Sequence, residues 1–262
     1  MKLDDAYANV PYIPDGESYP PRWAAEAATF REARAQAHDA LGVAYGDTPR
    51  QAYDIFRPET DQNGTLIFVH GGYWLRFDRS YWSHFATGAL ARGWSVAMPS
   101  YDLCPDVRIA DITTQIARAV ETIAAAEPGP LALAGHSAGG HLVSRMAQPG
   151  LLPGDVTDRI TTITPISPVS DLRPLLQTSM NDQFQLTEAT AAAESPALMT
   201  DRLAIPTHIW VGAEERPVFL DQARWQADAW SCPLRIDAGR HHFDIIDALK
   251  GPDSPLMQDI LG

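Results

Sequence analysis

Residues 131–140 read LALAGHSAGG, a short apolar run followed by a serine that has a glycine two positions away on either side. The run suits a buried strand, and the glycines of a G-x-S-x-G pattern permit a tight turn that larger side chains would block. Such a turn exposes the hydroxyl of Ser137 and points the amino end of the following helix at it. The alternative is a plain glycine-rich turn in which Ser137 only caps a helix. A base, an acid and an oxyanion hole elsewhere in the chain would identify Ser137 as a nucleophile.

Apolar runs and helical patterns alternate on both sides of this turn. Short apolar runs predict strands over residues 41–46, 51–58, 65–72, 94–102, 130–135, 160–167, 205–212 and 233–239. Helical spacing predicts helices over residues 21–42, 80–93, 105–127 and 137–148, and two more that begin near Pro217 and Phe243. This alternation favours an α/β fold with a mostly parallel central sheet and helices on both faces. Because no repeat or linker interrupts the pattern, we expect residues 1–262 to form a single domain.

The composition is that of a globular protein, since 45% of the 262 residues are hydrophobic and 20% are charged. A net charge of −13 opposes binding to phosphate backbones and anionic lipid, which argues against nucleic-acid and membrane partners. Residues 1–16 contain acids and prolines but no apolar segment, so they do not resemble a signal peptide. We therefore expect a cytoplasmic protein that acts on a small-molecule substrate, and the sequence leaves a homodimer open.

The stretch HGGYW at residues 70–74 follows a predicted strand and has the features of an oxyanion hole. Glycine has no side chain to shield the backbone. The amides of Gly72 and Tyr73 can therefore approach a developing oxyanion, together with the amide of Ala138. Each donor of this kind contributes about 3 kcal/mol in the transition state. The loop therefore supplies the second part of a candidate catalytic site.

Candidate acids and bases follow the serine along the chain. Glu215 lies in a turn after a predicted strand, and His241 and His242 follow the last predicted strand. The order serine, acid, histidine is the one expected of α/β hydrolases, in which His242 would accept the proton of Ser137 while Glu215 orients the imidazole. The residues alone do not choose between His241 and His242, and Asp171, after an earlier strand, is a rival acid. No metal site is expected, because spacings such as H-E-x-x-H are absent.

These motifs together resemble the α/β-hydrolase kynurenine formamidases, which are similar to the hormone-sensitive-lipase-like esterases. The resemblance rests on HGGYW, on GHSAGGHL at residues 135–142, on the acid turn and on the H-F-D ending, and it extends over most of the chain. It implies an α/β-hydrolase fold, Ser137 as nucleophile, His242 (the histidine before Phe243) as base, and no cofactor. The family's acid is usually aspartate, whereas the matching position here is Glu215. The implied reaction is hydrolysis of an N-formyl arylamine with release of formate.

The leading hypothesis is a serine hydrolase that cleaves a small amide or ester through an acyl-enzyme. Its most specific form names N-formylkynurenine as the substrate. The same triad would serve a carboxylesterase or thioesterase for small acyl groups, since only the pocket distinguishes these reactions. Tyr73, Trp74 and His136 are expected to line that pocket, and residues 173–196 could fold over it as a small lid. The third hypothesis is a non-catalytic binding protein of the same fold, for which labelling of Ser137 by a fluorophosphonate is the discriminating test.

Overall fold

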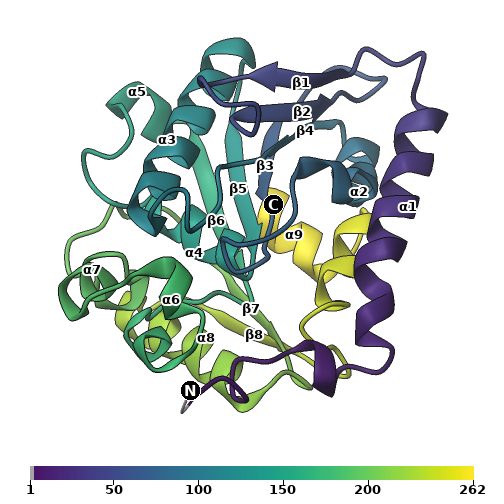
Figure 1. The fold of residues 1–262 in the computed structure, drawn as a ribbon. Helices are drawn as coiled ribbons and strands as arrows, with labels where there is room; N and C mark the ends of the chain where they lie inside the picture. Colours follow the sequence, from purple (N-terminus) through teal and green to yellow (C-terminus); the bar gives the residue numbers. More distant parts are fainter. Residues whose placement is uncertain (1–2) are drawn as a thin grey trace.

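A computed structural model describes residues 3–262, and its centre is one eight-stranded sheet (Figure 1). The strands span Ala40–Ala44 (β1), Ala52–Phe56 (β2), Gly64–Val69 (β3), Trp94–Pro99 (β4), Leu131–His136 (β5), Ile160–Ile166 (β6), Ile209–Gly212 (β7) and Leu234–Asp237 (β8). Their order in the sheet is β1-β2-β4-β3-β5-β6-β7-β8. The pairs β1–β2 and β2–β4 are antiparallel, and all pairs from β4 to β8 are parallel. The predicted mostly parallel α/β sheet is confirmed.

Helices cover both faces of this sheet. The α-helices span Tyr19–Ala33 (α1), Thr87–Ala91 (α2), Ile109–Ala126 (α3), Ala138–Arg145 (α4), Gly154–Thr157 (α5), Asn181–Phe184 (α6), Glu188–Ala193 (α7), Pro217–Trp230 (α8) and Pro255–Leu261 (α9). In Figure 1, α3, α4 and α8 lie on one side of the sheet, whereas α1, α2 and α9 lie on the other. The fold is therefore a three-layer arrangement with the sheet in the middle.

Two hydrophobic cores fill the space between the layers. Ile67 and Val69 of β3 join the core under α3, α4 and α8, while Leu66 and Phe68 join the core under α1, α2 and α9. Successive strand residues point to opposite faces, so a strand covered on both sides must be apolar at every position. Burying each such side chain stabilises the fold by about 1.5–3 kcal/mol relative to leaving it exposed. This burial explains why the strand could be recognised as a continuous apolar run.

The helix predicted over residues 21–42 is shorter than expected. Helix α1 ends at Ala33, and Gly42 lies within β1 with φ 68° instead of ending a helix. The end of α1 is a turn in which the guanidinium of Arg34 binds the carboxylate of Asp39 at 2.7 Å. An alanine-rich stretch carries little information about where its helix ends, because alanine is favourable at every helical position.

The stretch predicted as one helix over residues 80–93 is only partly α-helical. Two 3₁₀ turns, Arg79–Tyr81 and Ser83–Ala86, precede the short helix α2. These turns bury the rings of Trp82 and Phe85 in the core on the α1 side of the sheet. Tertiary packing of two large rings has overridden the helical pattern there.

The parallel strands bring several loops to one edge of the sheet. The segments that follow β3, β5, β7 and β8 all leave from carboxyl ends of neighbouring parallel strands. Ligands of open α/β sheets bind at this edge, so the candidate residues in these segments can meet there. Within residues 3–262, no helix combines the length and the apolar character needed to cross a membrane.

Candidate active site

Ser137 occupies a strained turn between β5 and α4. Its backbone has φ 57° and ψ −116°, a conformation that costs a residue with a side chain on the order of 1–3 kcal/mol. Close packing holds it: a Cβ at Gly135 would lie 2.2 Å from the carbonyl oxygen of Gly139, and a Cβ at Gly139 would lie 2.0 Å from that of Val69. The amide of Ser137 also donates to the carbonyl of Ile166 at 2.8 Å. The strand–turn–helix expected from the G-x-S-x-G pattern is present, and both glycines are required by the lack of space.

The HGGYW loop leaves β3 and packs directly against this turn. A Cβ at Gly71 would lie 2.8 Å from the carbonyl oxygen of His136 and 3.0 Å from the Cβ of Ser137, so only glycine allows this approach. Gly72 and Tyr73 follow with φ 114° and 54°. Consecutive residues with left-handed backbone conformations can present their N–H groups to one anion. Gly72, Tyr73 and Ser137 all line the same cavity.

His70 anchors the first residue of this loop. Its ring is stacked on that of Tyr101, with centroids 4.5 Å apart, and lies parallel to that of Trp82 at 6.0 Å. Nδ1 donates to the carbonyl of Gly71 at 2.7 Å, and the hydroxyl of Tyr101 donates to the carbonyl of His70 at 2.9 Å. Burial lowers the pKa of His70 to about 4, so the ring is neutral at physiological pH. His70 is therefore a structural residue of the loop.

His242 and Glu215 form a buried pair. Nδ1 of His242 lies 2.6 Å from Oε2 of Glu215, and both side chains are almost inaccessible to solvent. The other carboxylate oxygen, Oε1, accepts from the amide of Gly212 at 2.8 Å and from the hydroxyl of Ser167. Phe219 packs on the imidazole with ring centroids 4.3 Å apart. Because the carboxylate accepts the Nδ1 proton, Nε2 is left to exchange a proton with another group.

The rivals of this pair have other partners. Nε2 of His241 lies 3.1 Å from the hydroxyl of Tyr19, and its Nδ1 accepts from backbone amides. Asp171 forms an ion pair with Arg173 at 2.6 Å. Burial acts to raise the pKa of Asp171, but the hydrogen bonds from Arg173 outweigh it and hold that pKa below its usual range. Of the two histidines and two acids left open by the sequence, the structure thus brings His242 and Glu215 together.

The three side chains expected in the pocket have different positions. His136 lines the cavity and donates from Nε2 to the carbonyl of His242 at 2.8 Å; burial and electrostatic interaction with the imidazole of His242 hold the pKa of His136 far below its usual range. Tyr73 also lines the cavity. Trp74 does not line it, contrary to expectation, because the ring is fully buried and packs edge-on against His141 and Phe184. Trp74 follows Tyr73 with φ 56°, and the loop turns it toward the core.

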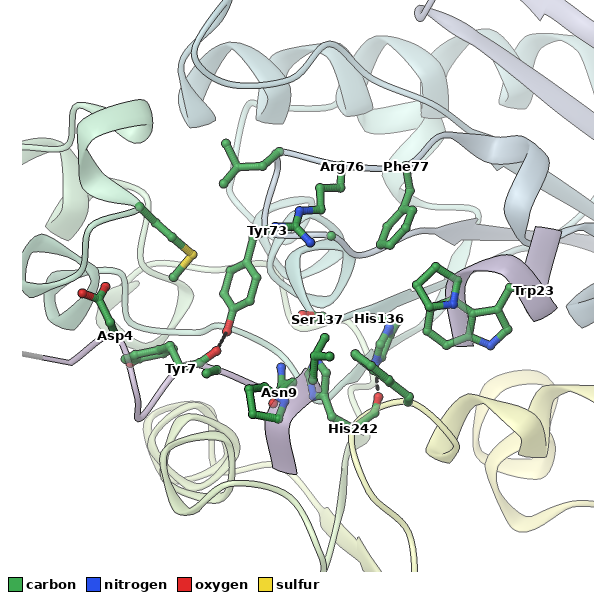
Figure 2. Close-up of a pocket in the computed structure, with 18 of the residues that line it drawn as sticks. Asp4, Tyr7, Asn9, Trp23, Tyr73, Arg76, Phe77, His136, Ser137 and His242 are labelled. Atoms are coloured by element: carbon green, nitrogen blue, oxygen red, sulfur yellow. Dashed lines mark hydrogen bonds between the residues drawn. The ribbon is translucent and has the colours of Figure 1, made fainter. Parts of the chain in front are cut away.

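One cavity of about 450 Å³ is lined by five of the candidate residues, namely Gly72, Tyr73, His136, Ser137 and His242 (Figure 2). Ser137 and His242 line it together with aromatic rings from distant parts of the chain, namely Trp23, Phe77, Trp82 and Phe243. In Figure 2, Trp23 lies on the opposite side of Ser137 from Tyr7 and Tyr73. A cavity of this size, mainly apolar with a few polar groups, is suited to a small aromatic ligand.

An outer wall of the cavity is formed by residues 3–13, the N-terminal strap. The hydroxyl of Tyr73 donates to the carbonyl of Tyr7 at 2.8 Å, and the side-chain amide of Gln222 donates to the hydroxyl of Tyr7 at 2.9 Å. Arg216 binds the carboxylate of Asp5 at 2.9 Å. The strap was not foreseen from the sequence, because it has no periodic apolar pattern and its contacts are with residues far along the chain.

Asn9 of the strap places an unsatisfied polar group in this wall. Its side chain is only 8% exposed and lines the cavity, and Oδ1 has no hydrogen-bond partner among residues 3–262. A buried acceptor left in this state costs about 1–3 kcal/mol. A ligand with an N–H donor would satisfy it, so the strap can add polar recognition to the cavity.

The segment of residues 173–196 contributes part of the same wall. It contains the 3₁₀ turn Arg173–Gln177 and the short helices α6 and α7. Three of its residues line the cavity, namely Ser179, Met180 and Gln183. The segment is thus in contact with the candidate site, and its action as a lid stays a prediction.

Comparison with known proteins gives a consistent picture. A family model described as an alpha/beta hydrolase fold matches residues 66–216. The kynurenine formamidase of Drosophila melanogaster is 31% identical over 234 residues, which cover 82% of this chain and 78% of that protein. The kynurenine formamidase of Salmo salar is 27% identical over 244 residues, which cover 87% of this chain and 83% of that protein.

A solved structure extends the similarity to the full chain. The crystal structure of a proposed thioesterase from Silicibacter sp. TM1040 is 52% identical in sequence, with a TM-score of 0.98. The match covers 100% of both chains, so the strap and residues 173–196 are included in it.

Proposed function

The chain belongs to the α/β-hydrolase family, in the branch that contains the kynurenine formamidases, and on this premise we propose that it is a serine hydrolase that releases formate from an N-formyl arylamine. The observation that supports this most is the buried His242–Glu215 pair, which shares one cavity with Ser137 and the HGGYW loop. The aromatic lining of that cavity suits the aryl group of such a substrate.

The first half of the proposed reaction forms a formyl-enzyme. Oγ of Ser137 adds to the formyl carbon while its proton passes to Nε2 of His242, and Glu215 stabilises the imidazolium. His242 then returns the proton to the arylamine nitrogen as the C–N bond breaks, which leaves a formyl ester on Ser137. In the second half, water adds to the ester, His242 takes a proton from it, and formate departs as Ser137 regains its hydrogen.

Three backbone amides are the proposed oxyanion donors in both halves. They belong to Gly72, Tyr73 and Ala138, the last being the residue after the nucleophile. Each donor would contribute about 3 kcal/mol to the transition state, because it is already oriented before charge develops. The strained turn at Ser137 and the close approach of Gly71 support this assignment.

The direct test is kcat/KM for N-formyl-L-kynurenine, measured by formate release, with p-nitrophenyl acetate as reference and Ser137→Ala as blank. We expect a clear preference for the formamide, which the variant abolishes. Fast ester cleavage without formamide turnover would overturn the formamidase proposal and retain the serine mechanism. Failure of a fluorophosphonate to label the folded protein would overturn the mechanism as well.

A thioesterase for small acyl groups is the second candidate, favoured by the 52% identical structure described as a proposed thioesterase. The same residues would perform it, with a thiolate in place of the arylamine as leaving group. The two functions are ranked by comparing two rates under the same conditions. One is the release of free thiol from a small acyl thioester, and the other is the release of formate from N-formyl-L-kynurenine.

A further inference from the structure

Arg76 is the one arginine in residues 3–262 with no ion pair, hydrogen bond or ring contact for its guanidinium. Each of the other arginines there is paired with a carboxylate or donates to an oxygen of another residue. Arg76 is also the only arginine or lysine that lines the cavity within the described residues. The acidic residue that lines the same cavity, Asp4, accepts from the amide and the hydroxyl of Ser179.

The backbone of Arg76 is tied to the oxyanion loop. The amides of Leu75 and Arg76 both donate to the carbonyl of Gly72, at 3.0 and 3.1 Å. A Cβ at Gly72 would lie 2.6 Å from the carbonyl oxygen of Arg76, so the turn is closed tightly. Figure 2 shows the side chain of Arg76 extending from this turn toward Tyr73. The backbone of Arg76 is therefore fixed relative to the oxyanion loop, and its exposed side chain reaches the cavity.

We propose that Arg76 is an anion-binding subsite of this cavity and selects substrates that carry a carboxylate remote from the bond that is cleaved. The planar guanidinium matches a carboxylate through two parallel hydrogen bonds, which a neutral polar group cannot form as strongly. Phe77, the residue after Arg76, also lines the cavity and would contact the aryl group of the bound substrate. This inference rests on the proposed function, because that function places the cleaved bond at Ser137.

The test compares two ligands that differ only in the remote group, 3-acetoxybenzoate and neutral 3-acetoxybenzamide. Their dissociation constants are measured by calorimetry in the Ser137→Ala background, where neither is consumed. We expect the benzoate to bind about tenfold more tightly than the benzamide, since the pair is partly exposed to solvent. Arg76→Ala should remove this preference and Arg76→Lys should keep part of it. Raising the salt concentration should weaken only the benzoate.

A matched control removes the same charge elsewhere. Arg118 on α3 is likewise exposed, and its carboxylate partner, Asp47, is 3.9 Å away and almost fully exposed. Arg118→Ala should leave both dissociation constants unchanged. The proposal is overturned if the cavity of the Ser137→Ala protein shows no preference for the benzoate, or if Arg76→Ala weakens both ligands equally.

Turnover separates this inference from the proposed function. If 3-acetoxybenzoate is preferred through Arg76 but N-formyl-L-kynurenine is not hydrolysed, the anion subsite stands and the formamidase proposal fails. If N-formyl-L-kynurenine is hydrolysed with the same kcat/KM by the enzyme and by Arg76→Ala, the formamidase proposal stands and the anion subsite fails.

Discussion

The cavity has two walls of different construction. The inner wall, made of the segments that follow β3, β5, β7 and β8, is held by backbone contacts such as that between Gly139 and the carbonyl of Val69. The outer wall, the N-terminal strap with residues 173–196, is held mainly by side chains, such as Tyr73 on the carbonyl of Tyr7. The inner wall carries the proposed nucleophile and base, Ser137 and His242, and the outer wall lines the same cavity.

This difference teaches which features of the site can vary. A backbone clash of 2.0 Å cannot be relieved by a rotamer change, so the position of Ser137 is determined by sterics and cannot drift. A side-chain hydrogen bond can be lost for about 1 kcal/mol, so the strap can change its sequence while the fold persists. We therefore expect changes in the inner wall to act on kcat and changes in the outer wall to act on KM.

The largest effect should come from removing the nucleophile or the base. Ser137→Ala and His242→Ala should each lower kcat by about 10⁶-fold, because members of a triad act as a unit. The rate of formate release measures this loss of kcat, in variants whose melting temperature is unchanged. If a variant kept activity within tenfold of the unmodified enzyme, the substituted residue, Ser137 or His242, would have no part in the mechanism. The functional distinction between the inner and outer walls would then fail as well.

Glu215→Gln should have the next largest effect, lowering kcat by about 10³–10⁴-fold. The amide can donate to Nδ1 of His242, which favours the tautomer that cannot accept the proton of Ser137. Asp171→Asn is the matched control, since Asp171 is bound to Arg173, and it should leave kcat nearly unchanged. The reverse ranking of these two variants would assign the acid role to Asp171.

Acid should destabilise the fold, largely through buried histidines in and beside the inner wall. Burial lowers the pKa of His70 to about 4 and that of His141 to about 3, and burial together with electrostatic interaction with the imidazole of His242 lowers that of His136 well below its usual range. Below the ordinary pKa of about 6.5, the unfolded chain binds protons that the folded chain does not, so the free energy of unfolding falls as the pH falls.

Burial also lowers the pKa of His84 to about 4, so for the four histidines the expected loss between pH 7.5 and pH 5.5 is about 5 kcal/mol. Urea denaturation at the two pH values measures it, and His70→Gln should reduce the difference by about 1 kcal/mol. The strap contains no histidine, so its contacts should not add to this dependence. A stability that is constant over this range would contradict the neutral buried state of these rings.

Gly139→Ala tests whether sterics hold the inner wall. The added methyl group would lie 2.0 Å from the carbonyl oxygen of Val69, and we expect a loss of about 3 kcal/mol in the free energy of unfolding, with loss of turnover. Gly154→Ala is the control, because no atom lies within 4 Å of its Cβ position, and it should leave stability unchanged or slightly raised. Equal stability of the two variants would mean that the turn tolerates a side chain.

Tyr73→Phe should have the smallest effect, because it removes one hydrogen bond between the walls. We expect KM to rise about fivefold with kcat within twofold, which corresponds to about 1 kcal/mol of lost contact. Tyr45→Phe removes a comparable buried hydrogen bond, to Ser100, outside the cavity and should leave KM unchanged. A fall in kcat as large as the rise in KM would show that the strap also positions the oxyanion loop.

The two walls differ as well in how far the sequence predicts them. The strand before Ser137 and the glycine turn were foreseen, because the steric demand lies within ten neighbouring residues. The residues alone left His241 and His242 open, since adjacent residues in a loop point in directions that no pattern specifies. The family resemblance indicated His242, and the structure places His242 against Glu215. Trp74 was misplaced for a related reason: its neighbour Tyr73 lines the cavity, yet the backbone turns Trp74 inward.

The outer wall could not be predicted in the same way. Tyr7 meets Tyr73 and Gln222 only after the whole chain has folded, and these contacts leave no local signal. The alanine-rich stretch after residue 21 likewise did not specify the end of its helix, beyond which Arg34 pairs with Asp39. Contacts between residues far apart in the chain, such as that of Tyr7 with Gln222, form only in the folded protein.

The pairing of Trp23 with Trp82 has a practical consequence for spectroscopy. The two indole rings lie 4.9 Å apart, and both line the cavity. An aromatic molecule entering the cavity would change the surroundings of both rings at once, and with them the intensity of the protein's ultraviolet emission. The protein thus contains its own optical reporter of occupancy, so binding and release can be followed in real time without attaching a dye.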